Sequence, residues 1–286
     1  MAAEVEGGSP VSYEEHFFSA ADGLRLFYRR WFKDGARGLV ALVHGFAEHS
    51  GRYDHVAAAL NEAGYSAAAF DYRGHGQSGG RRAHIDSFDQ YLGDVRSFLA
   101  EIAQDGYPQP PVLLGHSQGG LIAARLAELD GERIRGLALS SPFFGLAMEV
   151  PALKVAAGRL VSKILPTLAM KSGVDPAWLS HDRQVVDRYA ADPLVSDVAT
   201  TRWFTEVMQA QQASMASAAG LKVPLLMLLA GDDKLASVQE SRRFFESAGS
   251  SDKRLEIYED FYHEIFNELG RDRPLSDLVD WLGRET

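Results

Sequence analysis

The stretch PVLLGHSQGGLIAARLAEL, residues 111–129, places a short apolar run, a glycine-rich turn and a helical pattern in direct succession. The turn reads Gly115-His116-Ser117-Gln118-Gly119, which is G-x-S-x-G between a strand and a helix. So sharp a turn strains the serine backbone, and side chains at the flanking positions would collide, which requires glycine there. The strain lifts the Ser117 hydroxyl above the strand end, beside a helix N-terminus that favours developing negative charge. The segment therefore predicts a nucleophilic serine.

Apolar runs followed by helical patterns repeat along the whole chain. A strand rich in aromatics is expected at residues 24–31, and short continuous apolar runs lie at 38–44, 65–70, 111–114, 134–139 and 223–229. Helical patterns lie between them at 53–62, 88–103 and 119–128. Apolar strands that alternate with helices are typical of a parallel sheet covered by helices. We therefore expect an α/β fold with a mostly parallel central sheet.

The alternation of strands and helices breaks between about residues 144 and 219, where helical patterns run on without a buried strand. This stretch is too long for one crossover connection. We expect a helical cap over residues 144–219, inserted between a first core segment, 13–143, and a second core segment, 220–286.

Composition excludes several classes of function. The chain has 286 residues, 46% of them hydrophobic and 24% charged, as in ordinary globular proteins. Its net charge of −10 argues against a nucleic-acid partner. The absence of cysteine excludes disulfides, thiolate metal sites and a cysteine nucleophile. We expect a cytoplasmic protein, because the first residues do not read as a secretory signal and no apolar run reaches the ~20 residues of a membrane span.

A serine hydroxyl needs a base, and the base needs an orienting carboxylate. In folds with this serine turn, the chain order is serine, acid, histidine. Two histidines follow Ser117, and His181 lies in the expected cap, whereas His263 comes just after the strand-like residues 254–258. His263 is therefore the predicted base. The acid is expected after the run at 223–229, where Asp232 and Asp233 compete and spacing alone does not separate them.

An oxyanion hole requires two backbone N–H donors. One belongs to the residue after the nucleophile, Gln118, and the other to the loop after the run at 38–44. That loop reads His44-Gly45-Phe46, in which the glycine lets the backbone turn inward. Phe46 is the predicted second donor.

Five motifs together resemble the monoacylglycerol lipase and lysophospholipase family, the serine-aminopeptidase-like branch of the α/β-hydrolases. They are HGFAEHSGRY (44–53), FDYRGHGQSGGRR (70–82), GHSQGG (115–120), SSPFF (140–144) and FYHEIFNE (261–268), and the resemblance runs from about Glu14 to Trp281. It implies an α/β-hydrolase fold with an inserted cap, and a serine ester hydrolase that needs no cofactor and acts on a small acyl lipid.

The resemblance also assigns residues. It implies the nucleophile Ser117, the base His263 and the acid Asp233, which precedes Leu235 by the family's spacing. It places the oxyanion hole at Phe46 and Gln118. The family often has methionine where Gln118 stands, a departure that spares catalysis but can change the polarity of the pocket.

The resemblance further implies that Glu48 and Arg52 form a polar region for the glycerol end of the substrate. A capping or supporting network around Glu48-His49-Ser50 is the alternative.

No cofactor or metal is expected. Residues 74–79 read GHGQSG and satisfy G-x-G-x-x-G, but they lead into a loop, whereas a dinucleotide-binding motif opens a helix. The resemblance accounts for these glycines as a tight turn. No metal-binding motif of histidines and carboxylates is present.

Within the expected cap, residues 150–171 place apolar side chains at helical spacing, at Leu153, Ala157, Leu160, Ile164 and Leu168. The basic Lys154, Arg159 and Lys163 lie largely elsewhere, and Pro166 is expected to bend or end the helix. Two interpretations remain: the apolar face packs over the core, or it contacts membranes or micelles.

The favoured function is a monoacylglycerol lipase that releases fatty acid and glycerol through an acyl-enzyme. A lysophospholipase or a general carboxylesterase is the alternative, followed by a serine peptidase or amidase. The sequence does not indicate an oligomeric state.

Overall fold

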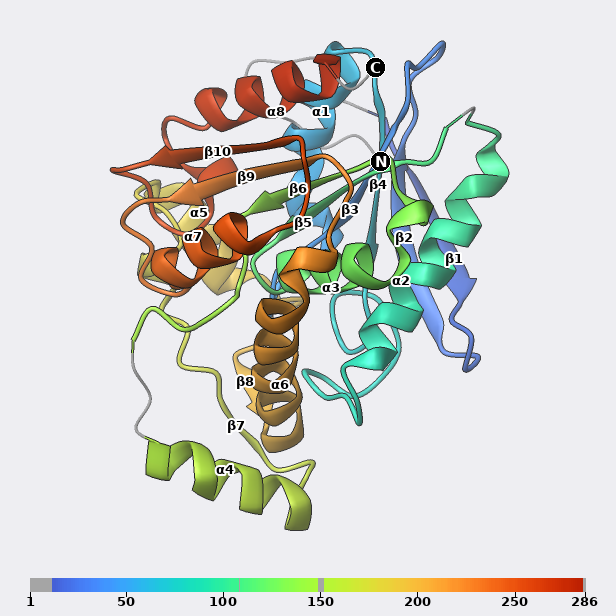
Figure 1. Cartoon of the computed structure of the whole chain (residues 1–286). Coiled ribbons are helices and arrows are strands. Elements are labelled where there is room, and N and C mark those ends of the chain that lie inside the picture. Colours follow the sequence, from blue (N-terminus) through green and yellow to red (C-terminus); the bar gives the residue numbers. More distant parts are fainter. Residues whose placement is uncertain (1–11, 108, 149–151, 285–286) are drawn as a thin grey trace.

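An eight-stranded sheet runs through the molecule in the order β1-β2-β4-β3-β5-β6-β9-β10 (Figure 1). The computed structural model describes residues 12–107, 109–148 and 152–284. The strands are β1 (Glu14–Ser19), β2 (Arg25–Trp31), β3 (Leu39–Val43), β4 (Ser66–Asp71), β5 (Val112–His116), β6 (Gly136–Ser140), β9 (Leu225–Ala230) and β10 (Lys253–Tyr258). From β4 to β10 all neighbouring strands pair parallel, whereas β2 pairs antiparallel with both β1 and β4. The expected mostly parallel sheet is confirmed.

Helices cover both faces of the sheet. On one face lie α1 (Asp54–Glu62) and α8 (Asp272–Arg284), and on the other lie α2 (Asp89–Ile102), α3 (Gln118–Asp130) and α7 (Val238–Ser247) (Figure 1). In β5, Leu113 belongs to the core on the α3 side, whereas Val112 and Leu114 belong to the core on the α1 side. Both faces are buried, which explains why these strands read as continuous apolar runs.

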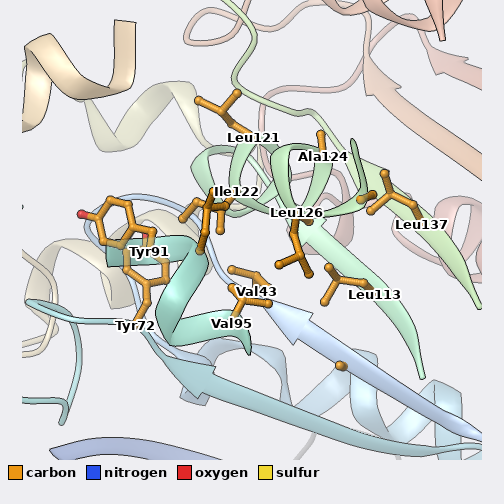
Figure 2. Close-up of a cluster of buried hydrophobic side chains, with 14 of the residues drawn as sticks. Val43, Tyr72, Tyr91, Val95, Leu113, Leu121, Ile122, Ala124, Leu126 and Leu137 are labelled. Atoms are coloured by element: carbon orange, nitrogen blue, oxygen red, sulfur yellow. The ribbon is translucent and has the colours of Figure 1, made fainter. Parts of the chain in front are cut away.

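The α3 side of the core is packed around the helix that follows the serine turn. Figure 2 shows Leu121, Ile122 and Leu126 of α3 among side chains of the neighbouring strands and of α2. Each of these three residues is fully buried. The apolar side chains of LIAARLAEL therefore fix α3 to the sheet.

Edge strand β1 has no counterpart in the sequence analysis, which began its strands at residue 24. Its exposed and buried positions are mixed, and Phe18 is its only residue in the core. An edge strand with so little buried surface does not produce an apolar run.

The segment between β6 and β9 contains α4 (Ala152–Ile164), β7 (Ala169–Lys171), α5 (Arg183–Ala191), β8 (Val198–Thr200) and α6 (Thr201–Ser217). Strands β7 and β8 pair antiparallel in a small separate sheet that was not expected from the helical patterns. Helix α6 packs against α3 of the core and against α4, which lies at the far end of α6 from the main sheet (Figure 1).

Helix α4 ends before Pro166, as expected, so Leu168 lies beyond the helix and just before β7. The side chains of Leu153 and Lys154, and all of residue 150, are outside the described part of the chain.

Replacing Leu126 with alanine should lower the free energy of unfolding by about 2–5 kcal/mol, because the side chain is fully buried and leaves a cavity. Leu129, one turn further along α3, is 52% exposed, and Leu129→Ala should change stability by less than about 0.5 kcal/mol. Urea unfolding followed by circular dichroism measures both. Equal losses in the two variants would contradict the packing described for α3.

Candidate active site

Ser117 occupies the turn between β5 and α3 in a strained backbone conformation, with φ of 52°. A Cβ on Gly115 would lie 2.5 Å from the carbonyl oxygen of Gly119, and one on Gly119 would overlap the carbonyl oxygen of Val43. Both positions therefore accept only glycine. The Ser117 N–H donates to the Ser140 carbonyl at 2.9 Å, which ties the turn to β6.

A chain of hydrogen bonds links the three residues of the predicted triad. Ser117 Oγ lies 2.8 Å from His263 Nε2, and His263 Nδ1 lies 2.7 Å from Asp233 Oδ2. The second carboxylate oxygen of Asp233 accepts from the backbone N–H groups of Leu235 and Ala236, at 2.8 and 2.9 Å. All three triad side chains are nearly inaccessible to solvent.

The competing carboxylate, Asp232, is placed differently. It is partly exposed and forms an ion pair with Lys234 at the surface. The geometry therefore places Asp233, and not Asp232, beside His263.

Two effects act on the pKa of His263 in opposite directions. Burial by itself lowers the pKa of the imidazole, but the charge and hydrogen bond of Asp233, together with the charges of Glu264 and Glu48, outweigh burial, and the pKa lies above its ordinary value of 6.5. Asp233 is therefore placed to stabilise the imidazolium that would form if His263 took a proton from Ser117.

The loop after β3 carries the predicted oxyanion donor Phe46. The Gly45 N–H donates to Glu48 Oε1 at 2.6 Å, and the Gly45 carbonyl accepts from the Tyr72 hydroxyl at 2.7 Å. A Cβ on Gly45 would lie 3.3 Å from the Cβ of Ser117, so the loop passes directly beside the nucleophile. Gln118 is the first residue of α3, where a backbone N–H has no partner within the helix.

The side chain of Gln118 lies outside the cavity, contrary to the expectation that it changes the polarity of the pocket. It is fully buried and is not among the residues that line the cavity, so the expected change in pocket polarity is wrong. The Gln118 amide and the Trp203 indole lower the pKa of the buried Tyr91 hydroxyl, against the larger raising effect of burial.

Glu48 and Arg52 belong to a buried ionic cluster beside the triad. Arg52 Nη1 donates to Glu48 Oε2 and to Glu264 Oε1, both at 2.6 Å, and Arg52 Nη2 donates to Glu264 Oε2 at 2.7 Å. Glu48 Oε1 accepts from Gly45 and, at 2.7 Å, from the Tyr53 hydroxyl. Burial raises the pKa of Glu48, but the charge of Arg52, together with His116, His44 and the hydrogen bond from Tyr53, outweighs burial, and the net pKa is lowered.

A cavity opens above Ser117 with two kinds of wall. The apolar wall includes Phe46, Phe143 and, from α6, Trp203, Phe204, Val207 and Met208. The polar wall includes Glu48, Tyr189 and Glu264, with Arg52 stacked on the Tyr189 ring at 4.8 Å. Arg52 itself is not among the lining residues, so it acts from behind Glu48 and Glu264.

Three residues that line the cavity were not predicted from the sequence: Glu264, Tyr189 and Trp203. Glu264 directly follows the predicted base, which was the one available signal for it. Tyr189 and Trp203 come from α5 and α6, between β6 and β9, and belong to no motif, so their place in the cavity depends on tertiary folding.

The G-x-G-x-x-G segment forms turns in the loop between β4 and α2. Gly74 and Gly76 have φ of 74° and 49°, and a Cβ on Gly76 would overlap the Asp71 carboxylate. These turns account for the glycines. Within residues 12–107, 109–148 and 152–284, no group of three or more histidine or carboxylate side chains could hold a metal ion.

The family model described as serine aminopeptidase, S33, matches residues 34–270 of this chain. The chain is 35% identical to a monoacylglycerol lipase of Mycolicibacterium smegmatis, over 94% of this chain and 96% of the relative. It is 32% identical to phospholipase YtpA of Bacillus subtilis, over 85% and 93%. The crystal structure of Paleococcus ferrophilus monoacylglycerol lipase superposes with a TM-score of 0.84 at 34% identity, covering 91% of this chain and 99% of that one. The expected α/β-hydrolase fold is confirmed.

The geometry predicts how hydrolysis of a soluble p-nitrophenyl ester depends on pH. The imidazolium form of His263 cannot accept the Ser117 proton, so kcat/KM should fall as pH drops through a pKa above 6.5. Asp233→Asn removes the charge that raises this pKa, so the midpoint should move to lower pH and kcat should fall on the order of 10⁴-fold. Asp232→Asn is the matched control and should leave both unchanged. An Asp232→Asn profile that shifts in place of the Asp233→Asn profile would contradict the assignment.

Proposed function

Because this chain belongs to the serine aminopeptidase S33 family of α/β-hydrolases, we propose that it is a serine ester hydrolase that acts on monoacylglycerols and releases a fatty acid and glycerol. The hydrogen-bonded chain from Asp233 through His263 to Ser117 carries the proposal. The cavity supports the substrate class, since an apolar wall suits an acyl chain and a polar wall suits an alcohol.

The proposed reaction has two halves. His263 removes the proton of Ser117 as the oxygen attacks the ester carbonyl, and the N–H groups of Phe46 and Gln118 stabilise the oxyanion. The tetrahedral intermediate collapses when glycerol leaves with the proton from His263, and an acyl-enzyme remains. Water, deprotonated by His263, then attacks the acyl-enzyme and releases the fatty acid and free Ser117.

Glu48 has two parts in this proposal. It holds the loop that carries Phe46, through its bond to the Gly45 N–H, and it lines the polar wall that would face the glycerol. Arg52 orients Glu48 from behind and does not touch the substrate.

A lysophospholipase is the second candidate function, and the similarity to a phospholipase supports it. It would use the same triad and differ only in accepting a charged headgroup. A general carboxylesterase would use the same triad on short soluble esters.

A turnover panel separates these functions. Monoacylglycerols, diacylglycerols, triacylglycerols, lysophospholipids and short soluble esters are each given to the purified protein, and released fatty acid is measured. The expected result is a clear preference for monoacylglycerols, with Ser117→Ala abolishing turnover and labelling by a fluorophosphonate. Activity that survives Ser117→Ala would overturn the mechanism, and activity on short soluble esters alone would overturn the substrate class.

We further propose that the cap contacts a lipid surface through α4 and the residues that follow it. Five apolar side chains there are between 43% and 69% exposed: Leu160, Ile164, Leu165, Leu168 and Met170. Of the predicted apolar face, Leu160, Ile164 and Leu168 are therefore exposed, and the interpretation in which they pack over the core is wrong. Exposed Arg159, Lys163 and Lys171 lie in the same segment of an acidic chain, which suits an anionic lipid surface. No helix in the described part of the chain is long and apolar enough to cross a membrane.

Co-sedimentation with vesicles of phosphatidylcholine and phosphatidylglycerol tests this contact. Leu160→Ser combined with Ile164→Ser should weaken vesicle binding at least about tenfold, since each change removes apolar surface that the lipid would bury. Leu129→Ser, on α3 and equally accessible, is the control and should bind as the wild type does. Vesicle binding that the double substitution leaves unchanged would contradict the proposal.

A further inference from the structure

The polar wall of the cavity holds more negative than positive charge. Glu48 and Glu264 both line the cavity, are 2% and 4% exposed, and share one guanidinium, that of Arg52. The cluster of two carboxylates and one guanidinium therefore carries one net negative charge next to His263. In a buried site this charge is weakly screened.

Glu264 is held rigidly in this wall. Its two carboxylate oxygens accept from the two terminal nitrogens of Arg52, and Oε2 also accepts from Asn267 Nδ2 at 2.9 Å. Its backbone N–H donates to the Leu179 carbonyl of the cap at 2.9 Å. A bidentate Arg–carboxylate pair has fixed geometry, so the guanidinium of Arg52 is not free to turn towards a ligand.

The histidines around this wall do not supply a compensating positive charge. Burial, together with the neighbouring His263, lowers the pKa of His116 to about 4. His263 itself is paired with Asp233. Burial raises the pKa of the Tyr189 hydroxyl, and the charge of Glu264 raises it further, as a negative field in this wall would.

Cations are scarce around the rest of the cavity. Lys234 is the one lysine or arginine among the described residues that line it. Its side chain is 42% exposed and is already paired with Asp232. It is a weak partner for an anion, because exposed ammonium groups are hydrated and screened.

We infer that Glu264 is a specificity-determining residue: as the second carboxylate on one guanidinium, it leaves the cluster with a net negative charge, which makes the alcohol side of the cavity select uncharged alcohols and exclude phosphate-bearing ones. A phosphate within about 6–8 Å of one unpaired negative charge, at an effective dielectric constant near 20, is disfavoured on the order of 10–100-fold. The inference rests on the proposed function, because it concerns the alcohol portion of the same ester. It favours the lipase over the lysophospholipase.

The first experiment uses a matched pair of esters, 1-octanoylglycerol and 1-octanoylglycerol 3-phosphate, below their aggregation concentrations. Wild-type protein should have at least about tenfold higher kcat/KM for the neutral ester. Glu264→Gln keeps the size of the side chain and one acceptor oxygen but removes the charge, so the ratio of the two kcat/KM values should shift about tenfold or more towards the phosphate ester. A merely structural loss would lower both values and leave their ratio unchanged.

Glu259→Gln is the matched control. Glu259 lies exposed in the same loop region and does not line the cavity, so the same change in net charge should leave the ratio unchanged. A wild-type protein without preference for the neutral ester, or a Glu264→Gln ratio equal to that of the control, would overturn the inference.

A second measurement keeps the test independent of how Glu264→Gln folds and of which ester the protein hydrolyses. The ethers 1-O-octylglycerol and 1-O-octylglycerol 3-phosphate cannot be hydrolysed, and each competes with fluorophosphonate labelling of Ser117 in the wild type. The neutral ether should protect at least about tenfold more tightly at low salt. If monoacylglycerols are not substrates but the neutral ether still protects better, the proposed function fails while the charge selection stands, and equal protection by both ethers overturns the charge selection.

Discussion

The active site depends on one close approach, that of the first turn of α3 to the end of β3. Gly119 lies so near the Val43 and His44 carbonyl oxygens that any side chain there would overlap them. This contact sets the height of α3 above the sheet, and with it the position of Ser117. It also sets the spacing between the two predicted oxyanion donors, because Gln118 belongs to α3 and Phe46 follows β3. A single steric constraint thus determines how the predicted nucleophile lies relative to the predicted oxyanion hole.

The strain at Ser117 is sustained by its surroundings. A non-glycine residue with φ of 52° is unfavourable by itself. Here the N–H of Ser117 bonds to β6, while its carbonyl accepts from Leu121 and Phe143. The fully buried face of α3 anchors the other end of the turn. Because β5 lies between β3 and β6 in the middle of the sheet, the neighbouring strands leave the turn no room to relax.

The sequence predicted what local chemistry determines. The serine turn, the alternation of strands with helices, and the histidine after β10 are all properties of short segments, and the central sheet follows from them. The acid needed more than spacing, because the difference between Asp232 and Asp233 is which of them faces His263 once the loop has folded. Glu264 was not predicted as a site residue, because its place in the site depends on its pairing with Arg52, which is 212 residues away in the chain. The apolar face of α4 was ambiguous for the same reason. An apolar stripe in the sequence predicts a helix face but does not indicate whether the protein core or a lipid surface covers that face.

The ionic cluster around Arg52 connects three parts of the molecule: the loop after β3 through Glu48, the loop that carries His263 through Glu264, and the cap through the bond of Glu264 to Leu179. Stability alone does not account for such a cluster, since burying charges costs several kcal/mol each and apolar replacements of similar volume are often equally stable. An arrangement of two carboxylates on one guanidinium is less favourable still, because one charge stays uncompensated. Its position against the cavity, with each carboxylate fixed by several donors, is better explained by the field it creates where the alcohol leaves. The cluster that positions the oxyanion loop is then also the one that decides which alcohols reach it.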